Sequence, residues 1–215
     1  MVDDPRFTMP LYTLPLAASH LAMPASTLGS WARKSNLLTM VPGEGREPRL
    51  PFIGLVEAQL YRELRKAKLS MQAITAGMAV VRRELGDRML ERGVLATDGR
   101  EILMNLGGQE RAEWERARDR QGGLPEVIEI GLKPIIYMGD DLPGRLRLTA
   151  YGDTPVIADP LYSFGQPIVE TSGARVEDVL SLFKAGEKLS IVADEMGLGE
   201  DDVESIVRTH LTLAA

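Results

Sequence analysis

Hydroxyl and cationic side chains gather on a short predicted helix near the start of the chain. Apolar residues recur at helical spacing from Leu14 to Leu21 and again within residues 25–34, and Pro24 suits the start of the second helix. Two short helices joined by a tight turn form a helix-turn-helix. Side chains of this kind suit contacts with phosphates and base edges, although a helical hairpin with a polar face is the competing interpretation. The outward face of the second helix carries Ser26, Thr27, Ser30, Arg33 and Lys34.

Two further cations lie in a loop downstream. Residues 42–51 are rich in proline and glycine, which is typical of a loop or of the tip of a wing. Arg46 and Arg49 could contact phosphate there. A solvated loop with no such contact is the alternative.

A cluster of acids marks the other end of the chain. The pattern predicts three short helices over residues 176–183, 189–196 and 200–210. Acids at a helix N-terminus are favoured by the helix dipole, but in a DNA groove they would face phosphates of the same sign. We therefore expect this surface to bind a protein partner or a second copy. The acids lack the spacing of a calcium loop. The third helix begins with Glu200, Asp201, Asp202 and Glu204.

The charge distribution divides the chain in the same way. Residues 1–100 hold 14 Lys and Arg against 10 Asp and Glu, whereas residues 151–215 hold 4 against 12. A basic region attracts phosphate backbones, and an acidic region attracts basic protein surfaces. The two ends should therefore have different partners.

Several function classes are disfavoured by composition. The chain has no cysteine, and its two histidines, His20 and His210, are far apart in sequence, so we expect no metal site and no cofactor. The sequence shows neither a Ser/His/Asp spacing nor a phosphate-binding glycine loop, so we expect no enzymatic activity. The Asp140-Asp141 pair is interpreted as part of a turn. No signal peptide or membrane span is recognisable, which predicts a cytoplasmic protein.

The remaining elements predict a mainly α fold with small β elements, an α+β class. Residues 52–92 have helical periodicity, and Ser70 is a good N-cap for a helix over 71–85. Asp98-Gly99 predicts the turn of a hairpin over 94–104, and a polar helix is expected over 109–120. Further strands are expected over residues 126–130, 135–138 and 145–149.

Two segments resemble known families. The pattern Ala17-Ala18-x-x-Leu21-x-Met23, followed by Thr27-Leu28-x-x-Trp31, resembles the opening helix-turn-helix of MerR-like winged regulators. Residues 156–211, with Gly165-Gln166-Pro167-Ile168-Val169 and Gly173-Ala174-Arg175, resemble a small helical domain of bacterial antitoxins. Ala174 stands where that family usually has threonine. The order of parts is similar to VapB-type antitoxins that pair with PIN-like ribonucleases.

The resemblance implies a function and a division into parts. A MerR-like DNA-binding region with the hairpin would span residues 1–123, connecting strands 124–155, and a three-helix antitoxin domain 156–215. The protein would neutralise a cognate PIN-like ribonuclease and bind its own operon DNA, as a homodimer or within a toxin–antitoxin complex. The main alternative is a MerR-type regulator that responds to a small ligand and has no toxin partner. A purely structural interaction protein is a further alternative.

Overall fold

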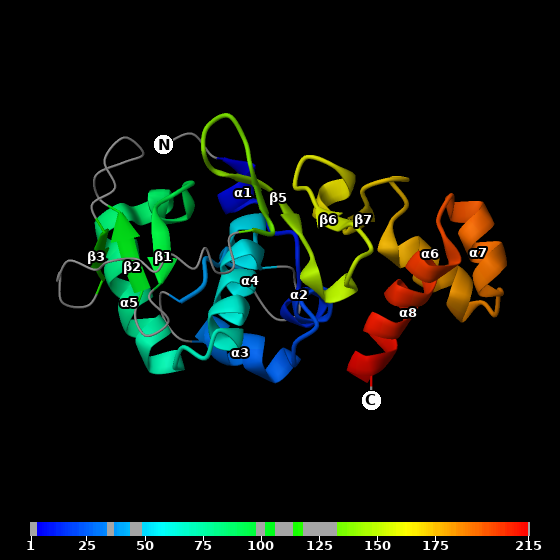
Figure 1. The fold of residues 1–215 in the computed structure, drawn as a ribbon, viewed down its shortest axis with the longest axis horizontal. Coiled ribbons are helices and arrows are strands. Elements are labelled where there is room, and N and C mark those ends of the chain that lie inside the picture. The colour runs from blue at the N-terminus through cyan, green and yellow to red at the C-terminus, as the bar shows by residue number, and fades with distance from the viewer. Residues whose placement is uncertain are drawn as a thin grey trace.

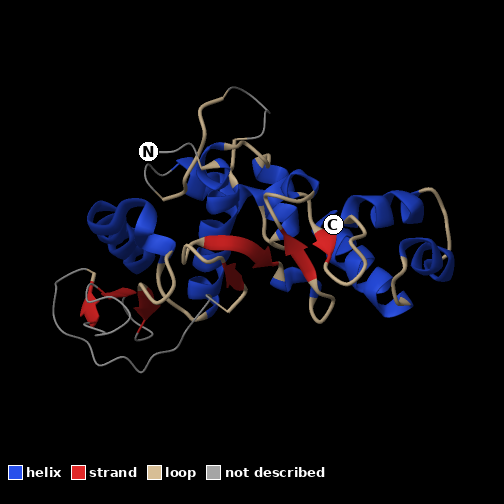
Figure 2. Cartoon of the chain, turned by 90° about the horizontal axis from the view of Figure 1, so that it is seen from above, coloured by secondary structure: helices blue, strands red, loops and turns tan. Residues whose placement is uncertain are grey.

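The chain forms an elongated molecule with helices throughout and two small antiparallel sheets. The computed structural model describes residues 4–33, 37–43, 49–97, 102–105, 114–117 and 133–214. Figure 1 shows a three-stranded sheet at one end, a group of helices in the middle, and three C-terminal helices at the other end. The same elements seen from above are drawn in Figure 2. This architecture confirms the expected class, mainly α with small β elements.

The N-terminal helices form where the sequence indicates. Helix α1 (Pro5–Thr8) is followed by α2 (Leu14–His20) and α3 (Ala25–Arg33). Thr13 caps α2, and the chain turns through Ala22, whose φ of 44° closes the helix end. The two helices pack together through small and apolar side chains, so the predicted helix-turn-helix is present.

Two long helices form the centre of the core. Helix α4 (Phe52–Lys66) is buried around most of its circumference, and α5 (Met71–Leu85) leads into a 3-10 helix η1 (Gly86–Leu90). Ser70 caps α5 through its hydroxyl, which accepts from the N–H of Ala73 at 3.0 Å. Helix α4 carries one acid, Glu57, on a buried face. Its side chain is fully buried, because α4 is covered by its neighbours and Arg82 on α5 supplies an ion pair at 2.9 Å.

The predicted hairpin is confirmed in a three-stranded sheet. Strand β1 (Leu95–Thr97) pairs antiparallel with β2 (Ile102–Asn105), and Asp98-Gly99 lies outside the described residues. The helix expected over residues 109–120 was wrong where the chain is described. Residues 114–116 form β3 (Trp114–Arg116) on the free edge of β2, because backbone pairing there overrides the helical propensity of the segment. The strand expected over residues 126–130 lies outside the described residues.

A four-stranded sheet leads to the C-terminal helices. It has the order β4 (Ile135–Tyr137), β5 (Pro143–Arg147), β6 (Val156–Ala158) and β7 (Ile168–Val169), all antiparallel. Two short 3-10 helices, η2 (Thr149–Tyr151) and η3 (Ser163–Gly165), lie between strands. The expected strands at 135–138 and 145–149 are therefore confirmed with shifted ends. The sheet runs across residue 155, where we expected one part of the chain to give way to the next.

Three helices end the chain as predicted. They are α6 (Val176–Lys184), α7 (Leu189–Met196) and α8 (Glu200–Ala214), and they bury one apolar face each against one another. Gly197 ends α7 in the left-handed region, with φ of 64°. Helix α8 also reaches η2, where Ser205 donates to the carbonyl of Tyr151 at 2.8 Å. The C-terminal helices are thus attached to the rest of the molecule through α8.

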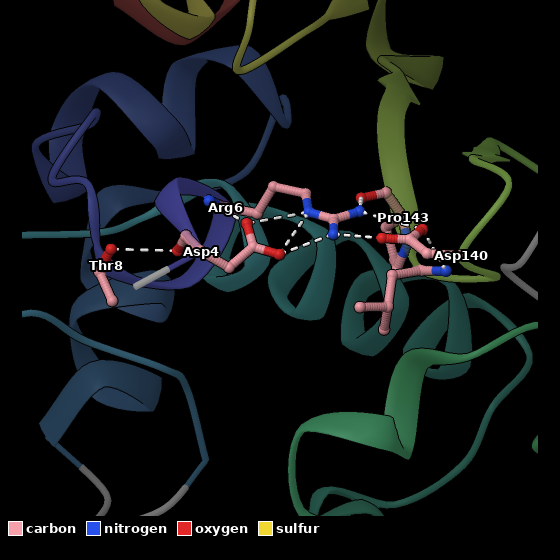
Figure 3. Close-up of polar contacts among 6 residues, drawn as sticks. Asp4, Arg6, Thr8, Asp140 and Pro143 are labelled. Carbon is pink, nitrogen blue, oxygen red and sulfur yellow. Dashed lines mark hydrogen bonds and ion pairs between the residues drawn. The ribbon is translucent and has the colours of Figure 1, made fainter. Parts of the chain in front are cut away.

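The Asp140-Asp141 turn has a structural role. Figure 3 shows Arg6 of α1 between Asp4 and Asp140, bonded to both carboxylates. The Arg6 guanidinium lowers the pKa of each of these carboxyls below its ordinary value. Arg6 also donates to the carbonyl of Pro143 at 3.4 Å. These contacts fasten the N-terminal helix to the β4–β5 connection.

Candidate nucleic-acid interface and acidic helix

Helix α3 is fixed to the core by its apolar side. Trp31 meets the ring of Tyr61 on α4 edge to face, with centroids 6.0 Å apart, and Leu28 is fully buried. Tyr61 in turn donates to the carbonyl of Leu37 at 2.7 Å. The opposite side of α3 is therefore held in a defined orientation toward solvent.

The predicted contact residues of α3 are on that outer side. Ser26 and Arg33 are exposed, and Thr27 and Ser30 are half-buried. Gly29 lies on the same helix beside the Arg33 side chain. The structure thus brings four of the predicted residues together on one short helix, and Lys34 lies outside the described residues. Hydroxyls and a guanidinium in this arrangement can donate to phosphate oxygens or base edges.

The loop that carries the other predicted cations is closed at its base by Arg49. The backbone N–H of Val41 donates to the carbonyl of Arg49 at 2.8 Å, and Arg49 Nε donates to the carbonyl of Val41 at 3.4 Å. Arg49 is therefore half-buried and bonded within the loop, and Arg46 lies outside the described residues. The contact of this loop with phosphate stays a prediction.

The four acids of α8 do not all face the same way. Glu200 and Asp201 are exposed in the first turn, and Glu204 is exposed and forms an ion pair with Arg208 one turn later. Asp202 is half-buried and accepts from the hydroxyl of Thr154 at 2.9 Å. Asp202 therefore fastens α8 to the body of the protein, and the other three acids form the accessible surface.

Two neighbouring histidines, the buried His20 and the half-buried His210, join α8 to the helix-turn-helix. His210 on α8 contacts the hydroxyls of Ser19 on α2, at 3.0 Å, and of Tyr151, at 2.9 Å. Its ring lies 6.2 Å from that of His20, and neither ring nitrogen of His20 has a partner among the described residues. Burial lowers the pKa of His20 to about 3, with a smaller contribution from His210. Burial also lowers the pKa of His210, so both rings are neutral at physiological pH. Their role is to pack α8 against the helix-turn-helix.

Sequence reasoning missed an exposed apolar loop. Leu161, Tyr162 and Phe164, between β6 and β7, are exposed, and the first two line a hollow of about 370 Å³. The sequence does carry a signal for this loop. Three large apolar residues occur within four positions of a segment that has neither helical nor strand periodicity.

The described residues include neither a cluster suited to a metal ion nor a helix suited to a membrane span. Among them there is no group of three or more His, Cys, Asp or Glu side chains able to hold a metal ion. None of the described helices has both the length and the apolar character needed to cross a membrane.

Known proteins similar to this chain point to one family. Residues 10–78, from α2 to the middle of α5, match a protein family described as "Putative DNA-binding HTH domain". A protein of Mycobacterium tuberculosis named "Putative antitoxin VapB45" is 33% identical over 222 residues, and the match covers 92% of each chain. The chain belongs to the VapB45 antitoxin family.

A solved structure agrees with this family membership. The crystal structure of Rv2018 from Mycobacterium tuberculosis is 28% identical and superimposes with a TM-score of 0.69, over 94% of this chain and 99% of that one. In this chain, the helix-turn-helix of α2 and α3 lies within residues 10–78, the part that matches the DNA-binding family. The expected VapB-type resemblance with a helix-turn-helix at the N-terminus is confirmed.

Proposed function

We propose that the chain is an antitoxin that neutralises a cognate PIN-like ribonuclease and represses its own operon by binding operator DNA. The observation that carries the proposal is the similarity to the VapB45 antitoxin along 92% of both chains, together with the helix-turn-helix match at residues 10–78. The protein would act in the cytoplasm without catalytic chemistry or a cofactor of its own.

Helix α3 would make the DNA contacts. Its outer side offers three hydroxyls and Arg33, and its apolar side is anchored by Trp31, so the contacts would be made without reordering the helix. Arg49 would add a phosphate contact, as would Lys34 and Arg46, which lie outside the described residues. As a two-fold dimer, the protein should protect operator half-sites one helical turn apart.

An electrophoretic shift with the upstream DNA of the operon tests the DNA-binding part. Arg33→Ala should weaken binding and reduce the salt dependence by about one phosphate contact. Arg83→Ala on α5 is the matched control, because Arg83 is equally exposed but is on another helix and pairs with Glu84. If wild type and the Arg33 variant bind the DNA equally well, α3 is not part of the DNA interface.

The accessible acids of α8 would contact the ribonuclease. An enzyme surface that binds RNA is generally basic, and acids complementary to it can steer association and cover it. The triple variant Glu200→Ser, Asp201→Ser, Glu204→Ser removes this charge and retains Asp202, which bonds Thr154 inside the protein.

Co-expression with the product of the neighbouring gene tests this part. The triple variant should recover less ribonuclease in a pull-down and should rescue growth less well than wild type. A control with Glu187, Asp194 and Glu195 replaced by serine removes the same charge from other exposed positions of the tail. If both triple variants rescue growth like wild type, the acidic surface of α8 does not bind the toxin.

A further inference from the structure

The loop between β6 and β7 exposes more apolar surface than any folding requirement explains. Phe164 is 79% exposed, Leu161 70% and Tyr162 54%, all within four positions of the loop after β6. The backbone of this connection between β6 and β7 can be followed in Figure 1. Single exposed apolar residues are ordinary on a protein surface, but a contiguous apolar patch typically marks an interaction site.

This exposure belongs to a loop that is held in place. The Asp159 carboxylate accepts from the N–H of Leu161 at 2.9 Å and from Arg145 Nε at 2.9 Å. At the other end of the loop, the Tyr12 hydroxyl donates to the carbonyl of Gly165. The aromatic ring of Phe164 is therefore presented by a fixed backbone.

The backbone at the tip is strained. Ser163 and Phe164 have φ of 50° and 54°, in the left-handed region that bulky side chains rarely adopt. Asparagine or glycine would adopt this conformation at lower cost. A large aromatic residue in a costly conformation that points it into solvent indicates a functional constraint on the ring.

A hollow lies beside the first part of the same loop, where Leu161 and Tyr162 line it. It has a volume of about 370 Å³. Its apolar lining comes mainly from Ile136 and Met138 of the β4–β5 hairpin and from Leu161 and Tyr162 of the loop, and the ion-paired Arg145 and Asp159 also line it. Gly144 leaves room for Met138, because a Cβ there would lie 2.1 Å from Met138 Cγ. The loop therefore carries an exposed apolar side chain, Phe164, two positions after Tyr162, which lines a largely apolar hollow.

We propose that this surface pairs two copies of the chain about a two-fold axis, with Phe164 of each copy in the hollow of the other. A two-fold interface must be complementary to itself, and one loop that carries both an exposed side chain and part of a hollow meets that requirement. The proposal rests on the dimer invoked for operator binding and assigns the surface that forms it.

The charges around the patch favour a second copy over the ribonuclease. Arg145 and Asp159, which line the hollow, pair at 2.9 Å, and Arg145 lies 4.0 Å from Glu170. The rim therefore carries both signs, already paired within the chain, so two identical rims would meet without strong repulsion. A basic RNA-binding surface would be attracted more strongly to the acids of α8.

Sedimentation equilibrium of the full chain tests the proposal. Wild type should be a dimer at micromolar concentration, and Phe164→Asn should weaken the dimer by about 30-fold or more, as expected for a central aromatic anchor. Asparagine tolerates the left-handed backbone, so the circular dichroism spectrum should be unchanged. Leu211→Gln, at a residue 60% exposed on α8, is the control and should remain dimeric.

Two results would overturn the proposal: a wild-type chain that is monomeric at about 100 μM, or a folded Phe164→Asn variant that dimerises like wild type. Leu161→Ser serves in the same assay if the Phe164 variant fails to fold. If wild type is monomeric and the Phe164 variant no longer binds the ribonuclease in the pull-down, the patch binds the toxin and self-pairing is overturned. The sedimentation measurement contains neither DNA nor ribonuclease. A failure of the proposed dimer surface is therefore distinguishable from a failure of DNA binding or of ribonuclease neutralisation.

Discussion

The buried His20 should make the stability of the protein fall as the solution becomes acidic. Its ring is 4% exposed, and burial lowers its pKa from 6.5 to about 3. Below pH 6.5 the unfolded chain binds a proton at this position, whereas the folded chain does not until the pH approaches 3. The stabilisation is therefore complete above pH 6.5 and is lost progressively as the pH falls toward 3.

The magnitude follows from the proton that only the unfolded chain binds. Each pH unit below 6.5 lowers the free energy of unfolding by about 1.36 kcal/mol. The protein therefore loses about 2 kcal/mol of stability between about pH 7.5 and about pH 5. His210, whose pKa burial also lowers, adds to the loss in the same direction. Replacing His20 with leucine removes its share of this dependence and also removes two ring nitrogens without partners among the described residues.

Urea denaturation followed by circular dichroism at a series of pH values measures this effect. Wild type should lose about 2 kcal/mol or more over the interval, and His20→Leu should lose about 2 kcal/mol less than wild type. At neutral pH the variant should be at least as stable as wild type. The reasoning is refuted if the variant retains the full pH dependence, because the proton would then bind elsewhere.

Three further substitutions should change stability in denaturant titrations at neutral pH. Ser70→Ala removes the cap of α5 and should cost about 1 kcal/mol, whereas Ser70→Asp should cost little. Glu57→Leu leaves Arg82 without its 2.9 Å partner and should cost about 3–5 kcal/mol, and a much smaller loss would show that the pair is not needed. Gly29→Ala should stabilise α3 by up to about 1 kcal/mol, because the added Cβ meets only Arg33 Nη1 at 3.5 Å; a loss of stability would contradict that geometry.

The helices could be predicted because their local signals agree with their packing. Apolar spacing placed α2, α3 and the three C-terminal helices, and the hydroxyl of Ser70 marked the start of α5. The outward side of α3 followed from the same periodicity, since Leu28 and Trp31 had to face inward.

The features that escaped prediction depend on distant parts of the chain. Glu57 is buried because Arg82, on the next helix, neutralises it. Residues 114–116 form a strand because β2 offers them an unpaired edge. Asp202 differs from its acidic neighbours only because Thr154 lies within hydrogen-bond distance. None of these partners is close in sequence, so periodicity and propensity carry no information about them.

The most direct test of the proposed function is an RNA cleavage assay with the product of the neighbouring gene, which the proposal expects to be a ribonuclease. RNA cleavage is measured while the purified full chain is titrated against a fixed amount of enzyme. We expect cleavage to fall to background as the two proteins approach a stoichiometric ratio. Cleavage that continues undiminished in a large excess of the chain would contradict its assignment as the antitoxin of that enzyme.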